Sequence, residues 1–163
     1  IPNYCTAIYW CALVFTIIAI TVNATTVLYS RFKGLIGLSF AAIISFALLW
    51  KLPYYIDGRL VNGLVVASFS SLIISLYFST SALTRFYSRF GFVIANALSL
   101  GIAAIIDGFI MRLFFTINNN FSYARIMDIF SRELSYKILY GLLASAIIFV
   151  ALRLLKNDTK EKA

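Results

Sequence analysis

Two stretches of sequence that are otherwise apolar enough to cross a membrane carry charged side chains inside them, among them two carboxylates and an ammonium. Asp107 lies within the apolar run 90–115, and Glu133 and Lys137 lie within the apolar run 130–155. An ionisable group in the hydrocarbon region is costly, so it indicates a functional site and is expected to have a partner. Two interpretations stay open for these residues, namely a contact that holds helices together and a contact with a substrate.

The residue types that are missing or scarce exclude several kinds of chemistry. Histidine is absent, which removes the commonest general base and metal ligand, and with it intramembrane proteolysis of the serine and histidine type. The aspartyl type needs a second intramembrane Asp, which the sequence does not offer. Cys5 and Cys11 are six residues apart, on different sides of a helix and outside any metal-type spacing. We therefore expect no enzyme, no metal site and no cofactor.

The composition indicates a membrane protein. Of the 163 residues, 62% are hydrophobic and 12% are charged, whereas an average globular domain has about 25% charged residues. A net charge of +8 would suggest a nucleic-acid partner in a soluble protein. Here the basic residues are scattered at the ends of apolar runs, which is a sign of membrane topology. The expected partner is the lipid bilayer, and no nucleic-acid partner is expected.

The apolar runs predict an all-α fold, a polytopic membrane bundle of about five transmembrane helices, because lipid offers the backbone no other hydrogen-bond partners. The predicted spans are 4–30, 34–50, 60–84, 90–116 and 130–155. A loop at 51–59 follows the second span, beside an interfacial belt of Trp50, Tyr54 and Tyr55. Residues 118–128 are expected to form a loop with a short interfacial helix. One transmembrane domain, 1–155, is then followed by a polar cytoplasmic tail, 156–163, that is expected to fray.

Small and polar residues recur at helical spacing along one side of each span. In the fourth span, Ala95, Ser99, Ala103 and Asp107 share one side, while bulky residues such as Leu98 occupy the other. Small residues let membrane helices approach closely, so these sides should face other helices. Close packing and a polar pathway are both consistent with the pattern. The corresponding stripes elsewhere are Thr16, Ala19, Asn23, Thr26 and Ser30; Gly37, Ala41 and Ser45; Ala67, Ser71, Ser75 and Ser79; and Glu133, Lys137, Gly141 and Ser145.

The distribution of Lys and Arg predicts the orientation of the chain. The connections after the first and third spans and the tail form the more basic side of the protein. The positive-inside rule therefore places the C-terminus in the cytoplasm. The expected location is the inner membrane of the cell. The chain begins at Ile1 rather than Met, and Ile1 would lie outside. A sixth helix upstream would bring both ends inside.

Depths estimated from the helical rise predict two polar layers. Asp107 lies roughly 26 Å from the cytoplasmic start of its span, and Lys137 lies about 10 Å from the outer start of its span, which puts both in the outer half. They should therefore pair, although Glu133, one turn before Lys137, is an alternative partner. Asn23 and Asn96 each fall about 10 Å from the cytoplasmic boundary. They would either contact a substrate or bond neighbouring helices.

Two motifs in the last third of the chain resemble a known family. Asn96, Ser99 and Asp107, followed by ELSYKILYGLL from Glu133 onward, resemble the last two helices of the VUT family of queuosine-precursor transporters. Family members have six helices with both ends inside, so this chain looks like a divergent member that lacks the first helix. The sequence NATTVLYS from Asn23 resembles the second helix of the family. Where the family has Asp, Glu, Gln and Asp, this chain has Asn23, Val27, Ala104 and Ala144.

The resemblance implies uptake of a deazapurine or a similar small polar ring compound. Asp107, Asn96 and Ser99 would hold polar edges of the ring, Lys137 would balance Asp107, and Tyr136 or Tyr140 would stack on the ring. The expected substrate-binding residues are thus Asp107, Asn96, Ser99, Lys137, Asn23, Glu133 and Tyr140. No catalytic residue is expected.

Two other functions fit the same sequence. The chain could be a structural subunit that does not transport, as part of a larger membrane complex or a homo-oligomer. It could also be the substrate-binding component of an energy-coupled vitamin importer, which would need a partner ATPase. The retained charges at Asp107 and Lys137 favour transport.

Overall fold

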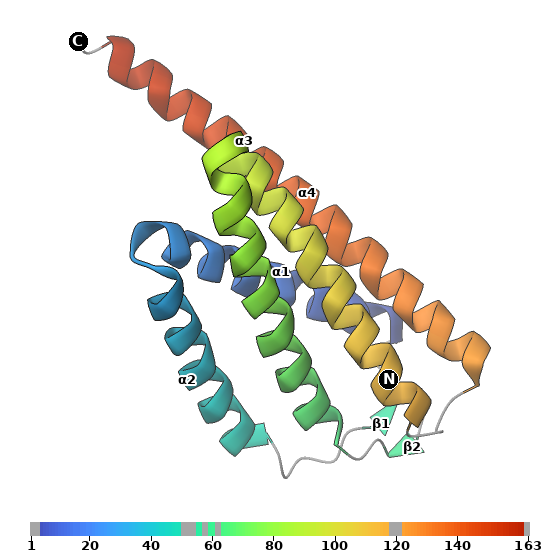
Figure 1. Ribbon diagram of the computed structural model, residues 1–163. Coiled ribbons are helices and arrows are strands. Elements are labelled where there is room, and N and C mark those ends of the chain that lie inside the picture. The colour runs from blue at the N-terminus through green and yellow to red at the C-terminus, as the bar shows by residue number, and fades with distance from the viewer. Residues whose placement is uncertain (1–3, 50–54, 57–58, 61–62, 118–121, 162–163) are drawn as a thin grey trace.

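The computed structural model is built from helices, as Figure 1 shows. It describes residues 4–49, 55–56, 59–60, 63–117 and 122–161. Its elements in chain order are α1 (Tyr4–Leu28), α2 (Arg31–Leu49), β1 (Tyr55–Ile56), β2 (Arg59–Leu60), α3 (Leu64–Ile117) and α4 (Tyr123–Glu161). Four of the described helices are long and apolar enough to cross a membrane. The all-α prediction is confirmed, and the helices have the character of a multi-pass membrane protein.

The number of such helices is four, not the five predicted, because α3 contains both the third and the fourth predicted spans. Only Gly91, with φ 73° and ψ 177°, leaves the helical conformation within α3. Without a Cβ, glycine adopts this backbone readily, so no loop is needed at this point. A straight helix of this length would measure about 81 Å, far more than a bilayer. The chain instead reverses direction at the kink (Figure 1), which gives α3 a first arm, 64–90, and a second arm, 92–117.

Two serine contacts show that the arms of α3 pack antiparallel. Ser71 on the first arm reaches Asp107 on the second, with 2.6 Å between the hydroxyl and the carboxylate. Ser79 donates to the backbone oxygen of Ser99 at 3.0 Å. Moving eight residues along the first arm thus moves the contact eight residues back along the second.

The turn between α1 and α2 sets the contact face of α2. The Ser30 hydroxyl accepts a hydrogen bond from the backbone N–H of Lys33 at 3.4 Å, as a capping residue does, and α2 begins at Arg31. A Cβ on Gly34 would lie 3.1 Å from the Thr26 hydroxyl oxygen, so glycine permits the close approach of the two helices.

The stripe predicted for α2 was wrong. Gly37 and Ala41 are exposed, Ser45 is half-buried, and the buried positions are Gly34, Leu38 and Ala42. The second span also begins three residues earlier than predicted.

The connection before α3 differs from the predicted loop. Tyr55 pairs with Leu60 and Ile56 with Arg59 in a two-stranded antiparallel sheet, so the third span begins at Leu64 rather than at residue 60. Several residues of the predicted belt and loop lie outside the described residues, namely Trp50, Lys51, Pro53, Tyr54, Asp57 and Gly58.

The fifth predicted span is longer than expected at both ends. Ser122 caps the start of α4, since its hydroxyl accepts from the N–H of Arg125 at 3.4 Å. The helix therefore begins at Tyr123, within the predicted interfacial loop, and continues as one element to Glu161. The predicted polar tail, 156–163, is thus helical as far as Glu161. Residues 118–121 and 162–163 lie outside the described part of the chain.

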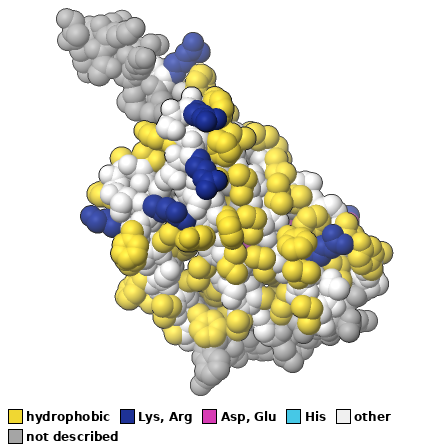
Figure 2. All heavy atoms as spheres, viewed as in Figure 1, with side chains coloured by type: hydrophobic (Ala, Val, Ile, Leu, Met, Phe, Trp, Pro, Cys, Tyr) yellow, Lys and Arg dark blue, Asp and Glu magenta, His cyan; other side chains and the backbone are white. Residues whose placement is uncertain are grey.

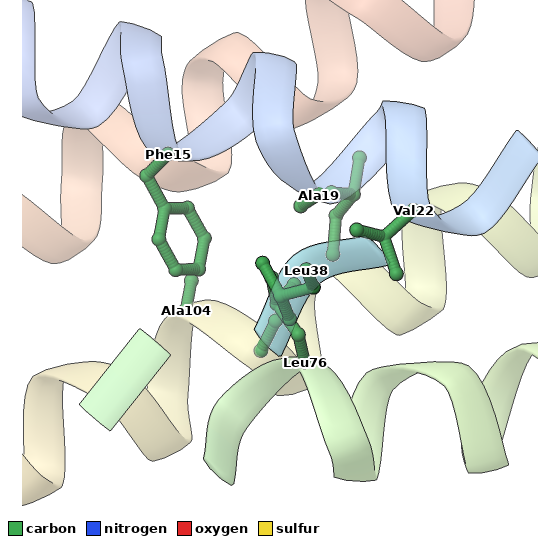
Figure 3. Packing of buried hydrophobic residues seen from close by; sticks show 8 residues of the cluster. Phe15, Ala19, Val22, Leu38, Leu76 and Ala104 are labelled. Atoms are coloured by element: carbon green, nitrogen blue, oxygen red, sulfur yellow. The ribbon is translucent and has the colours of Figure 1, made fainter. Parts of the chain in front are cut away.

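The core lies between α1, α2 and the two arms of α3, where leucine, valine and phenylalanine side chains pack against alanines. Figure 3 shows Phe15 and Ala19 of α1 facing Leu38, Leu76 and Ala104 of the other helices. The predicted inward side of the second arm is confirmed, because Ala95, Ser99, Ala103 and Asp107 are buried. The outward side is also confirmed, since Ile94, Leu98 and Phe109 are exposed. Figure 2 shows hydrophobic side chains spread over the visible face of the described residues.

Candidate functional site

Lys137 of α4 joins two carboxylates from two elements. Its ammonium forms ion pairs with Asp107 on the second arm of α3 and with Glu133 one turn earlier on α4, the latter at 2.5 Å. The exposed fractions of the side chains are 3% for Lys137, 8% for Asp107 and 20% for Glu133. The predicted pairing of Asp107 with Lys137 is present, and the alternative pairing with Glu133 is present as well. We call these three residues the charged cluster.

Neutral groups complete the charged cluster. Ser71 donates to the Asp107 carboxylate, and the Lys137 ammonium lies 4.5 Å from the centre of the Phe15 ring on α1. An aromatic face attracts a cation, most strongly where water is excluded. Helices α1, α3 and α4 therefore all contribute to the surroundings of a single ammonium group.

Close packing brings α4 to the second arm of α3 beside the cluster. A Cβ added at Gly108 would lie 2.8 Å from the ring of Phe130, a separation that real side chains do not show. Gly108 directly follows Asp107, and Phe130 lies one turn before Glu133 on α4. The absence of a side chain at Gly108 thus permits the helix approach that lets Lys137 reach Asp107.

A second group of polar side chains joins α1, α3 and α4. The Asn23 amide nitrogen donates to the Asn96 oxygen at 2.9 Å and to the Ser99 hydroxyl at 2.8 Å. Asn96 in turn donates to Ser145 of α4 at 3.4 Å. Asn23, Asn96 and Ser99 are completely buried. The structure therefore brings together the two asparagines of the predicted layer and the predicted site residue Ser99, and Asn23 bonds to both of the others.

Two oxygen atoms of α1 remain without a hydrogen-bond partner in the described part of the chain. They are Oδ1 of Asn23 and Oγ1 of Thr26, both buried. Buried polar atoms without a hydrogen-bond partner are rare in native structures. These two acceptors lie next to the polar layer on the same helix.

The two tyrosines predicted to stack on a substrate, Tyr136 and Tyr140, lie in different surroundings. Tyr136 donates a 2.7 Å hydrogen bond to the hydroxyl of Tyr9, and their ring centres are 4.1 Å apart. Tyr140 is half-buried. Among the described residues, no hydrogen bond joins Tyr140 to the charged cluster.

The sequence interpretation missed the roles of Phe15, Ser71 and Ser145. Ser71 and Ser145 were assigned to packing stripes, and their spacing alone does not separate a packing serine from one that donates to a charge. Phe15 follows one turn after Cys11, and nothing in its spacing indicates a cation partner. The depth estimate that placed Asp107 beside Lys137 could have singled out Ser71, because Ser71 lies at the matching depth on the neighbouring arm.

Comparison with known proteins gives no match to a family model, to a curated protein or to a solved structure.

Proposed function

We propose that this chain is a multi-pass carrier of the inner membrane that takes up a small polar compound between α1, α3 and α4. The observation that carries the proposal is the buried charged cluster. Replacing a buried ion pair by apolar residues is often neutral or stabilising, so stability alone is a weak reason to keep one. Charged residues within membrane helices commonly mark substrate and ion pathways.

The proposed topology has five crossings with the C-terminus in the cytoplasm. The two arms of α3 run antiparallel, and each has roughly the length that a bilayer requires. Helices α1, α2 and α4 supply the other crossings. The excess of Lys and Arg beside the first turn, beside the kink in α3 and in the tail supports this orientation.

The proposed substrate is a queuosine precursor or a ring compound of similar polarity. The resemblance of the last third of the chain to the VUT family supports this choice, as do the free acceptors of Asn23 and Thr26. A deazapurine edge carries N–H donors, and a buried acceptor without a donor is costly. We propose that ring N–H groups donate to these oxygens when the helices open.

Uptake into vesicles tests the proposal. Purified protein in lipid vesicles should accumulate radiolabelled aminomethyl-deazaguanine above the level of vesicles without protein. Asn23→Ala should reduce this uptake at least tenfold, because it removes contacts to Asn96 and Ser99 and the free acceptor together. Thr21→Val, at an exposed position on the same helix, is the matched control and should leave uptake unchanged. Absence of uptake by the folded protein would overturn the carrier proposal.

The second candidate is a membrane subunit that does not transport. It is favoured by the way in which Asn23, Asn96 and Ser99 satisfy one another, since such a network can serve helix packing alone. Native mass spectrometry of the protein from its own membranes separates the candidates. A purine-like mass supports the carrier, and a constant set of other proteins supports the subunit. A constant ATPase partner would instead support the importer component.

A further inference from the structure

The charged cluster is not balanced in charge. It holds the two carboxylates of Asp107 and Glu133 and the single ammonium of Lys137, so it carries one excess negative charge when all three are ionised. The cluster lies within helices that are apolar enough to span a membrane. An uncompensated charge in such surroundings is costly, which favours the uptake of one positive charge.

The two carboxylates differ in how firmly they are held. Asp107 accepts hydrogen bonds from both Lys137 and Ser71, the latter at 2.6 Å, and its side chain is 8% exposed. Glu133 accepts from Lys137 at 2.5 Å, and its side chain is 20% exposed. No second donor to Glu133 is found in the described parts of the chain. Glu133 is therefore the carboxylate with capacity for another positive partner.

A small hollow leads to Glu133 between the second arm of α3 and α4. It is lined by residues of both helices, among them Gly108, Arg112, Phe130 and Glu133. Its free space is that of about one water molecule. A proton carried by water fits this space, whereas an organic cation or a hydrated metal ion does not.

The charged and titratable groups that face Glu133 do not neutralise the excess negative charge of the cluster. On its own helix Lys137 is shared with Asp107, and from α1 the nearby titratable group is the thiol of Cys11. From α3, Arg112 also lines the hollow, but its guanidinium donates to the Tyr123 hydroxyl at 2.9 Å. Within the described residues, Arg112 forms no ion pair with Glu133.

We propose that Glu133 is a proton-binding site of this protein. A proton from water in the hollow adds to the Glu133 carboxylate, which becomes a neutral acid, and the ion pair with Lys137 becomes a weaker hydrogen bond. The ammonium stays with Asp107, so the cluster becomes electrically neutral without losing its link between α3 and α4. In the proposed carrier this proton is the coupling ion, and only that last step rests on the proposed function.

Infrared difference spectroscopy of the purified protein in lipid vesicles tests the site without any substrate. Steps in pH should reveal the C=O band of a protonated carboxylic acid, identified by its shift in heavy water. One component of this band should be present in the unaltered protein and in Asp128→Asn, which removes a more exposed carboxylate of α4, and missing in Glu133→Gln. A band that is equally strong in Glu133→Gln, or no such band at any pH at which the protein is folded, would overturn the proposal.

A second variant covers the case in which Glu133→Gln fails to fold. Glu133→Asp keeps a carboxylate at a different distance from Lys137, so the frequency of the band should shift. An unshifted band would assign the proton to another group and overturn the proposal.

The same vesicles test whether proton binding at Glu133 is coupled to uptake of the substrate. An inward proton gradient should increase uptake of aminomethyl-deazaguanine severalfold, and Glu133→Gln should lose this increase while Asp128→Asn keeps it. Uptake without a Glu133 band would overturn the proton site and leave the carrier standing. A Glu133 band without uptake would overturn the carrier and leave the proton site standing.

Discussion

Ser71, on the first arm of α3, donates a 2.6 Å hydrogen bond to the carboxylate of Asp107 on the second arm. The same hydroxyl lies 3.1 Å from the backbone oxygen of Asp107. Because a hydroxyl carries one proton, it can serve only one acceptor at a time, and the shorter contact is the one to the charged oxygen. This bond joins the two arms at the depth of the charged cluster.

Ser71→Ala should therefore lower the free energy of unfolding by about 1–3 kcal/mol, because it leaves a buried carboxylate oxygen without its donor. Ser70→Ala, at the exposed neighbouring position, should change the stability little. Thermal unfolding in a mild detergent measures both. If the two variants melt alike, the bond contributes nothing to the fold.

Lys137→Gln should destabilise the protein by about 3–5 kcal/mol, since it leaves the carboxylates of Asp107 and Glu133 without the ammonium that pairs with both. Adding Asp107→Asn should restore part of this loss, because one of the two uncompensated carboxylates is then gone. A double-mutant cycle on the free energy of unfolding measures the coupling. Strict additivity of the two single variants would mean that the residues do not interact.

Gly91→Ala should cost about 1–3 kcal/mol, because the backbone there has φ 73° and ψ 177°, a region that is open essentially to glycine alone. Gly101→Ala is the matched control, because it lies on the second arm and an added Cβ there meets nothing within 4 Å. The control should be neutral or stabilising by up to about 1 kcal/mol, since alanine favours a helix more than glycine does. The yield of monodisperse protein in detergent and its unfolding temperature report both effects.

Ala103→Leu should disrupt the bundle, because Ala103 is 0% exposed and its neighbours have no room for a larger side chain. Overpacking of a core typically costs about 1–3 kcal/mol. Leu98→Ala, at a side chain that is 43% exposed on the opposite face, should be tolerated much better. Size-exclusion chromatography after heating compares the two. Greater damage from Leu98→Ala would place the wrong side of this helix against the bundle.

The pairing of Asp107 with Lys137 was predictable because depth and helical face restrict where a charge can find a partner. In a segment that must be helical, position in the sequence gives both quantities directly. The exposed side of the second arm was also predictable, since bulky and small residues there separate cleanly by spacing. The depth comparison needed only the alternating direction of successive spans.

The helix count and the contact face of α2 were not predictable from periodicity. Arg85 to Phe90 look like a polar connection, yet each of these residues is compatible with a helix, and only Gly91 departs from it. In α2 small residues occur on two sides. The choice between Gly34 and Gly37 depends on Thr26 of the preceding helix, which is information from a different element.

The two serine contacts within α3 share one midpoint, at residue 89 just before the kink, and this common register restricts insertions and deletions. Losing or gaining one residue between Ser79 and Ser99 would turn one arm by about 100° and slide it by about 1.5 Å relative to the other. Both Ser71 and Ser79 would then lose their partners, and Asp107 would rotate away from Lys137. The number of residues in this hairpin is thus as tightly constrained as their identity, and natural length variation should occur outside it.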